Sequence, residues 1–215
     1  MSESSPFFDW ASPKTYVFPV DMDAYLSMPE EMAKHVEIRD GMIIHCEAAS
    51  PNHNAIARNV ERALLDGEAK RRHKEPCLRV NRDVDMLVSE VPLHYKRPDV
   101  IVYRCVKEPR GRWKRKPMIG DTLLVVEVVS PTTVTADLIE KRADYARFGI
   151  PHYWIIRMAE DDGPAVSIET LKLASDGTYS SHITDRESDS FAPAIDALVP
   201  FAVSATWEQL DEGVD

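Results

Sequence analysis

The sequence has no apolar run long enough to cross a membrane and no recognisable export signal. A membrane-spanning helix needs about 18 or more consecutive apolar residues, and no segment of the 215 residues approaches this length. The first residues, MSESSPFFDW, hold no basic stretch followed by an apolar one, which a secretion signal requires. We therefore expect a cytoplasmic protein with no membrane partner.

Cysteine is scarce, and its positions form no known pattern. The chain has three cysteines, Cys46, Cys77 and Cys105, which lie far apart and include no Cys-x-x-Cys pair. Disulfide-rich proteins and zinc proteins place their cysteines in recurring pairs. The sequence therefore supports neither a disulfide framework nor a zinc site.

Positive charge is also in short supply. The chain carries 26 Lys and Arg against 36 Asp and Glu, a net charge of −10, which argues against a protein that simply adheres to nucleic acid. Two basic clusters run against this balance, at residues 70–74 and 104–116. Each is either a solvated loop or helix end, or a local phosphate-contacting surface. The candidates for substrate contact in the second cluster are Arg110, Arg112 and Lys114.

Apolar spacing predicts one α/β domain over residues 21–215, after an extended segment at residues 1–20. Ile56, Val60 and Leu64, for example, follow one another at helical intervals. The expected elements are a helix at 21–35 capped by Asp21, a hairpin at 36–48 around Asp40-Gly41, a helix at 52–73, strands at 77–88, 97–104 and 123–129, a helix at 134–148, a strand at 152–156, antiparallel strands after residue 164, and a last helix from about Ser204.

The central strands are expected to form one mixed sheet. The segments 97–103, 123–129 and 152–156 are short and apolar, and the helix at 134–148 joins the last two. Such a crossover makes the two strands it joins parallel and lays the helix on one face of the sheet. The fold class is therefore a mixed β-sheet flanked by helices, with a β-rich C-terminal extension.

Glu127 is the most informative residue, because apolar residues surround it in the strand LLVVEVV. A carboxylate in a strand covered on both faces loses its hydration, which is unfavourable unless a cation or several donors compensate. Asp99 enters another apolar strand, PDVIVY. The pair indicates a Mg²⁺ or Mn²⁺ site, because these ions prefer a few hard oxygen ligands. A Glu on an exposed strand face, or in a buried ion pair, is the alternative.

Lys141 is the third unusual residue, because it interrupts an apolar stripe formed by Leu138, Tyr145 and Phe148. The helix follows the strand of Glu127 directly, so its first turns must lie near that strand's C-terminal end, where sites in α/β sheets usually form. The alternative is a lysine whose stem packs on the protein while its ammonium reaches water. If Lys141 instead meets Glu127 and Asp99, the three groups compensate one another.

The chain contains a series of ordered motifs, which are AYLSMPE, VEIRDGMII, SPNHNAIARNV, RPDVIVY, LLVVEVVSPTT, DLIEKRADY and GIPHYWII. Together they closely resemble the bacterial Uma-two family of restriction endonucleases, which belongs to the PD-(D/E)XK nuclease superfamily. The resemblance covers residues 22–200, nearly the whole chain. It implies a restriction-endonuclease-like core in which acidic side chains hold a metal ion at a mixed sheet.

Matched position by position, the resemblance implies catalytic roles for Asp99, Glu127 and Lys141, with Asp99 and Glu127 as the metal ligands. The superfamily lysine usually follows the glutamate by two residues, where this chain has Val129. Lys141 takes its place from the next helix. Glu37 matches an acidic residue that can complete the cluster.

One further residue, His53, matches the family, and another, Arg157, departs from it. His53 matches a histidine that could contact substrate, although a helix residue without a catalytic role fits equally well. Arg157 stands where family members often have Asp. The core site is unaffected, but an acidic role at that strand end is in doubt.

The expected function is hydrolysis of phosphodiester bonds in DNA by a Mg²⁺-dependent endonuclease. A bound Mg²⁺ lowers the pKa of a water and neutralises charge on the phosphate, while Lys141 orients the water or holds a phosphate oxygen. Because cutting both strands needs two sites, we expect a homodimer. The alternative is a nuclease-fold protein that binds nucleic acid or regulates without turnover, a reading that the acidic composition favours.

Overall fold

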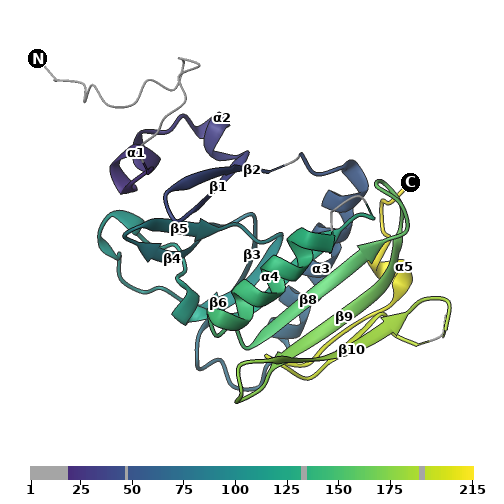
Figure 1. The fold of residues 1–215 in the computed structure, drawn as a ribbon. Helices are drawn as coiled ribbons and strands as arrows, with labels where there is room; N and C mark the ends of the chain where they lie inside the picture. Colours follow the sequence, from purple (N-terminus) through teal and green to yellow (C-terminus); the bar gives the residue numbers. More distant parts are fainter. Residues whose placement is uncertain (1–18, 47, 132–134, 189–191) are drawn as a thin grey trace, which may run out of the picture.

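The computed structural model describes residues 19–46, 48–131, 135–188 and 192–215, so most of the expected segment 1–20 lies outside the described residues. Its largest feature is a six-stranded mixed sheet in the order β10-β9-β8-β7-β6-β3 (Figure 1). The strands are β3 (Leu78–Arg82), β6 (Val100–Arg104), β7 (Thr122–Val129), β8 (His152–Met158), β9 (Ala165–Leu173) and β10 (Tyr179–Asp185).

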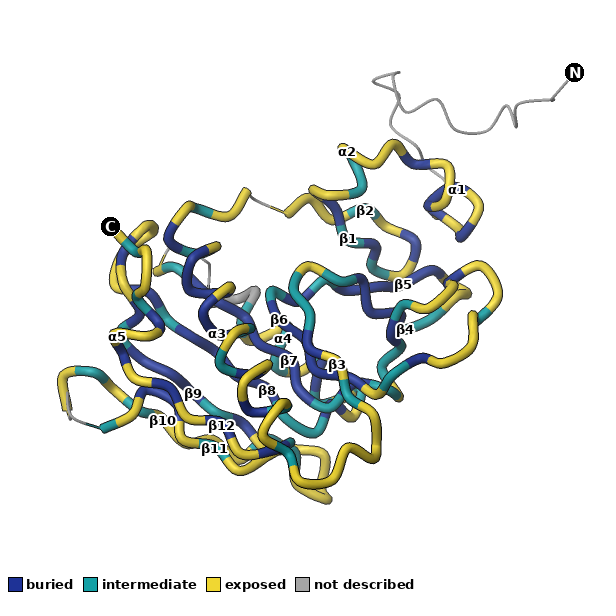
Figure 2. Tube along the Cα trace, turned by 180° about the vertical axis from the view of Figure 1, so that it is seen from behind, coloured by how far each residue is buried: buried dark blue, intermediate teal, exposed yellow. Residues whose placement is uncertain are grey.

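Helices cover both faces of this sheet. On one face, Ile56, Val60 and Leu64 of α3 (Pro51–Ala69) pack in one apolar cluster with Val126 of β7. On the other face, Tyr145 of α4 (Thr135–Arg147) packs with residues such as Val125 and Ile155. Because alternate residues of β7 point to opposite faces, a strand covered on both sides has to be apolar throughout. The central strands are accordingly buried, whereas the loops are exposed (Figure 2).

The expected arrangement of the central strands is confirmed. Strand β7 pairs antiparallel with β6 and parallel with β8, and α4 connects β7 to β8. The β-rich tail is confirmed as well, because β9 and β10 pair antiparallel at one edge of the sheet. The mixed sheet flanked by helices thus agrees with the fold class expected from the sequence.

A second, four-stranded sheet lies beside α4, in the order β2-β1-β5-β4. The expected hairpin is confirmed, and Asp40 and Gly41 at its turn have positive φ angles of 50° and 80°. Strand β5 was not expected. It is buried along its whole length, but His94 and Lys96 are polar, so its sequence does not show the apolar pattern typical of a buried strand. The strands are β1 (Val36–Arg39), β2 (Met42–His45), β4 (Met86–Glu90) and β5 (Leu93–Lys96).

The expected helix at 21–35 is two short helices, α1 (Met22–Ser27) and α2 (Glu30–Ala33). Asp21 caps α1 as expected, accepting a hydrogen bond from the Ala24 N–H at 2.9 Å. The prediction of one helix was wrong because Pro29 disfavours helical geometry at the preceding residue, and Met28 is extended there, with ψ of 132°.

The last helix also begins later than expected. Residues Val203–Ala205 form β12, which pairs with β11 (Ile195–Ala197), and the helix α5 runs from Trp207 to Leu210. Its capping box uses Thr206 and Gln209 rather than Ser204 and Glu208. None of the helices in the described ranges combines the length and the apolar character needed to cross a bilayer.

Cys77 and Cys105 form a disulfide, with Cα atoms 5.4 Å apart. This bond was not expected from the sequence, because the two cysteines are 28 positions apart and form no Cys-x-x-Cys pair. The sheet brings them together: β3 and β6 are antiparallel, with Leu78 opposite Arg104, so the residues flanking this pair also face each other. Cys46 is free and exposed.

The carboxylate of Asp85 connects the four-stranded sheet to the loop that holds the second basic cluster, residues 104–116, called the basic loop below. It accepts a hydrogen bond from the Tyr25 hydroxyl at 2.6 Å and pairs with Arg97 and Lys116, each at 2.6 Å. Burial by itself would raise the pKa of Asp85, but the two cations and the hydroxyl lower it below its usual value.

We expect Asp85→Asn to lower the free energy of unfolding by about 3–5 kcal/mol at pH 7, because the mostly buried Arg97 and the half-exposed Lys116 lose their common buried partner. A lowered carboxyl pKa contributes stability above the unfolded-state value of about 3.9, and this stability is lost as the pH falls through the native pKa. The difference between variant and wild type should therefore shrink near pH 3. Urea unfolding at both pH values measures it.

The matched control is Glu30→Gln, which removes an exposed partner of Lys34 on α2. Exposed ion pairs contribute at most about 1 kcal/mol, so this variant should unfold like the wild type at both pH values. An Asp85→Asn variant as stable as the control would contradict the assignment.

Candidate active site

Glu127 and Lys141 form an ion pair near the C-terminal end of β7, with Lys141 Nζ 2.9 Å from Glu127 Oε2. Asp99, in the turn before β6, accepts a hydrogen bond from the Val128 N–H at 2.7 Å. Since Val128 follows Glu127, the two carboxylates lie close together. The structure thus brings these three residues together, with the ammonium within a few ångströms of a carboxylate as expected. Their roles as metal ligands and catalytic residues stay predictions.

The helix α4 supplies two donors to Glu127 from successive turns. Lys141 and Tyr145 are four residues apart, so they lie on one face of the helix. The Tyr145 hydroxyl donates to Glu127 Oε1 at 2.6 Å, while Lys141 approaches the other oxygen. The Lys141 side chain is only 20% exposed. Its ammonium therefore binds the carboxylate inside the site instead of reaching out to water.

Burial dominates the electrostatics of this site. Glu127 is 4% exposed, and burial raises the pKa of its carboxyl above the usual value. The charge of Lys141 opposes this shift, and the nearby Asp99 adds to it. Burial and the charge of Glu127 also raise the pKa of Tyr145, which keeps its hydroxyl protonated as a donor. A second cation near the carboxylates would therefore be favourable.

His53 joins the site from the first turn of α3. Its Nε2 lies 3.0 Å from the Val128 carbonyl oxygen and 3.3 Å from Asp99 Oδ2. Burial lowers the pKa of His53, but the hydrogen bond and charge of Asp99 outweigh it, so that the pKa is raised. Nδ1 is buried and has no hydrogen-bond partner among the described residues. The ring therefore braces Asp99 against β7.

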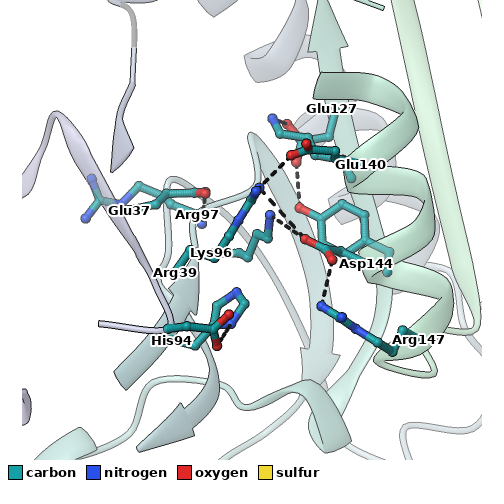
Figure 3. Close-up of polar contacts among 12 residues, drawn as sticks. Glu37, Arg39, His94, Lys96, Arg97, Glu127, Glu140, Asp144 and Arg147 are labelled. Atoms are coloured by element: carbon teal, nitrogen blue, oxygen red, sulfur yellow. Dashed lines mark hydrogen bonds and ion pairs between the residues drawn. The ribbon is translucent and has the colours of Figure 1, made fainter. Parts of the chain in front are cut away.

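Glu37 approaches the site from the small sheet. Its Oε1 accepts a hydrogen bond from the Arg97 N–H at 2.6 Å, two residues before Asp99. Its charge contributes to the raised pKa of Tyr145. Figure 3 shows Glu37 beside Arg97, while Glu127 lies against the helix α4. Glu37 is thus a neighbour of the site with no direct hydrogen bond or ion pair to Glu127.

A charged network that sequence analysis missed holds the small sheet against α4 (Figure 3). The side chain of Lys96 is 2% exposed and its Nζ lies 3.1 Å from Asp144 Oδ2. Arg39 pairs with Glu140 at 2.8 Å and reaches Asp144 at 3.9 Å. No sequence signal pointed to it, because Lys96 stands between Tyr95 and Arg97 in a polar stretch. The network fixes β1, and with it Glu37, relative to Glu127.

The basic residues proposed as substrate contacts lie elsewhere. Arg110 pairs with Asp121, Arg112 pairs with Asp23 at 2.5 Å, and Lys114 is exposed. Their loop joins the end of β6 to the start of β7, whereas Asp99 and Glu127 lie near the opposite ends of these strands. The structure therefore does not bring them to the carboxylates, and substrate contact by this loop stays a prediction.

The cluster at residues 70–74 has mainly structural contacts. Arg71 donates to the carbonyl oxygens of Glu75 and Pro76, and Lys74 binds the Glu68 carbonyl and carboxylate. These bonds close the C-terminal end of α3. The interpretation as a helix end is therefore favoured for these two residues.

We expect Tyr145→Phe to lower the free energy of unfolding by about 1.5–3 kcal/mol, the usual contribution of a hydrogen bond to a charged group. The loss should be largest where Glu127 is ionised, because a protonated carboxyl needs the donor less. Urea unfolding measures this, and a double-mutant cycle with Glu127→Gln should give a non-additive term.

Tyr179→Phe is the matched control, since its hydroxyl donates to the neutral Ile150 carbonyl at 2.7 Å. Its loss should be smaller and independent of Glu127. Equal losses in both variants, with additive energies in the cycle, would show that Tyr145 does not compensate the carboxylate.

Comparison with known proteins supports the fold. A crystal structure described as "a putative nuclease belonging to DUF820 from Anabaena variabilis ATCC 29413" is similar, with a TM-score of 0.62 and 16% identity over 92% of this chain and 100% of that one. No curated protein matches the sequence. The Uma2 family, described as "Putative restriction endonuclease", matches residues 22–199. This match covers most of the chain, which therefore belongs to the Uma2 family.

Proposed function

We propose that the protein is a Mg²⁺- or Mn²⁺-dependent endonuclease that hydrolyses phosphodiester bonds in DNA. The observation that carries this proposal is the pairing of Lys141 with Glu127 next to Asp99. This is the acid-acid-lysine set of the PD-(D/E)XK nucleases that the sequence resembles. Membership of the Uma2 family supports the same reaction class.

The donor set suits a hard divalent cation. Asp99 and Glu127 would hold it, and the Val128 carbonyl oxygen, which lies 3.0 Å from His53 Nε2, is a candidate backbone ligand. Mg²⁺ typically takes one or two protein carboxylates and keeps several waters, so two carboxylates suffice, although no group of three acidic, His or Cys residues gathers in the described parts of the chain. Bound there, the ion would supply a water of lowered pKa and neutralise phosphate charge.

The residues of the chain then have distinct tasks. Lys141 would move its ammonium from Glu127 to a non-bridging phosphate oxygen or to the attacking water, which places positive charge where negative charge develops. Tyr145 keeps Glu127 oriented through its 2.6 Å hydrogen bond. His53 and the Val128 N–H hold Asp99. Glu37 would steer a water into the site.

The second candidate is a nuclease-fold protein that binds nucleic acid or regulates without turnover. The observation in its favour is that Lys141 already supplies Glu127 with a positive partner, so the pair is satisfied without a metal. The net charge of −10 also favours it. We prefer catalysis because Asp99 stays beside this pair and raises the pKa of Glu127, an arrangement that a cation would relieve.

We expect Glu127→Ala to abolish both thermal stabilisation by Mn²⁺ and nicking of plasmid DNA, while the fold is kept. Lys141→Ala should retain the stabilisation but lose cleavage about 10²–10³-fold, because the lysine acts on phosphate or water and not on the ion. Thermal unfolding with and without Mn²⁺, together with a plasmid assay, separates the two effects.

The matched control is Glu208→Gln, an exposed glutamate on α5 that should leave both readouts unchanged. Metal-dependent stabilisation without any cleavage by the wild type would favour the second candidate. Wild-type nicking that survives in Glu127→Ala would contradict the assigned site.

A homodimer is part of the proposal, because cleavage of both strands needs two sites. Strand β10 is at one edge of the large sheet and carries Ile183, which is 51% exposed. Edge strands pair readily with another copy. We expect light scattering to give the mass of a dimer for the wild type and of a monomer for Ile183→Lys. A wild-type monomer at high concentration would exclude dimerisation.

We propose the cytoplasm as the location, since DNA is the substrate. Disulfides are rare in reducing compartments, so the bond between Cys77 and Cys105 weighs against this location.

A further inference from the structure

A second buried carboxylate, Glu169 of β9, lies on the same face of the sheet as Glu127. It is 4% exposed. The strand register places Ile155 of β8 opposite both Glu127 and Glu169, so all three side chains leave the sheet on the face covered by α4. Adjacent strands lie about 4.8 Å apart, and two such steps put Glu169 about 10 Å from Glu127.

Two arginines bind the two oxygens of Glu169. Arg142 Nη1 lies 3.0 Å from Oε1, and Arg157 Nη2 lies 2.7 Å from Oε2. Arg142 directly follows Lys141 on α4. Arg157 is opposite Val129 in the register, one residue beyond the Val128 N–H that holds Asp99. Both arginines therefore flank the candidate active site.

Among the described residues, this triad of one carboxylate and two guanidinium groups has a net charge of +1. One carboxylate neutralises one guanidinium, and each guanidinium has five N–H donors in a fixed fork. The side chains of Arg142 and Arg157 are 40% and 36% exposed, so both reach solvent while Glu169 fixes their positions. The arginines of the basic loop differ, because Arg110 and Arg112 each have a carboxylate of their own.

A role confined to stability explains this arrangement less well. A single arginine would satisfy the buried carboxylate, and replacing a buried ion pair by apolar residues is often neutral or stabilising. The second arginine adds charge at the C-terminal end of β8, where bound substrate would have to pass. Fixed, half-exposed guanidinium forks suit bidentate binding of phosphate.

We propose that Arg142 and Arg157 form a binding site for a second backbone phosphate on the strand whose reacting phosphate lies at Lys141, with Glu169 as their positioning residue. The inference rests on the proposed nuclease function. One DNA strand carries a phosphate about every 3.4 Å of helix axis, so a site about 10 Å from Glu127 is within reach of the same strand.

The test is the salt dependence of binding to a short fluorescent DNA duplex in EDTA, measured by anisotropy. Arg142→Gln and Arg157→Gln should each weaken binding and reduce the slope of log K against log salt. Because the two arginines share one phosphate, neither reduction should exceed about 0.9, the value for one phosphate contact. Glu169→Gln keeps the shape of the side chain but removes the charge that holds both guanidinium groups, so it should also weaken binding, even though it removes a negative charge. Each arginine variant leaves Glu169 one cation, which protects the fold.

Arg147→Gln is the matched control, because Arg147 lies on the same helix and is 68% exposed but pairs with Asp144. It should bind DNA like the wild type. If both arginine variants and Glu169→Gln keep the wild-type affinity and slope, whatever their melting temperatures, the triad is purely structural and the inference is overturned.

Two failures are distinguishable. A wild type that binds and cleaves DNA, with arginine variants of unchanged slope and Michaelis constant, refutes the phosphate site and leaves the nuclease proposal standing. A wild type that neither binds nor cleaves DNA overturns the nuclease proposal, and the phosphate site falls with it.

Discussion

The buried charge of Glu127 is the constraint on which the arrangement around it depends. Strand β7 is covered on both faces, and an ionised carboxylate there loses several kcal/mol of hydration. Only a cation and a donor on the covering helix can compensate, and Lys141 and Tyr145 provide both from one face of α4. The position of α4 on the sheet is therefore constrained by two requirements: its apolar side chains must pack on the sheet, and Lys141 and Tyr145 must reach Glu127.

The same helix makes two further ion pairs with buried side chains, one on each sheet. Arg142 reaches Glu169 on the large sheet, and Asp144 reaches Lys96 on the small one. Because these contacts lie on different sides of α4, they fix both the rotation of the helix about its axis and its position along that axis. Glu37 depends on this bracing, since it reaches the site only through the small sheet. The site is thus assembled from two sheets whose common support is one helix.

Much of the fold and three site residues could be predicted because they leave local signals. Glu127 conflicts with its apolar strand, and Lys141 conflicts with its apolar stripe, so each is visible in a short window. Lys96, Glu169 and the Cys77–Cys105 pair gave no such signal. Their partners are distant in the sequence, and burial of Lys96 makes sense only once Asp144 lies against it. Contacts between residues that are distant in the sequence could therefore not be predicted.

The distribution of charge bears on the choice between catalysis and passive binding. A helix that only covered a sheet would be served by apolar residues, and buried ion pairs rarely add stability over such packing. Here α4 directs Lys141, Arg142 and Asp144 to three separate buried partners. Two of these contacts place cations beside Asp99 and along the neighbouring strand ends, on a protein of net charge −10. Local positive charge on an acidic body opposes general adhesion to nucleic acid yet favours phosphate at one place, which is what selective hydrolysis of a phosphodiester requires.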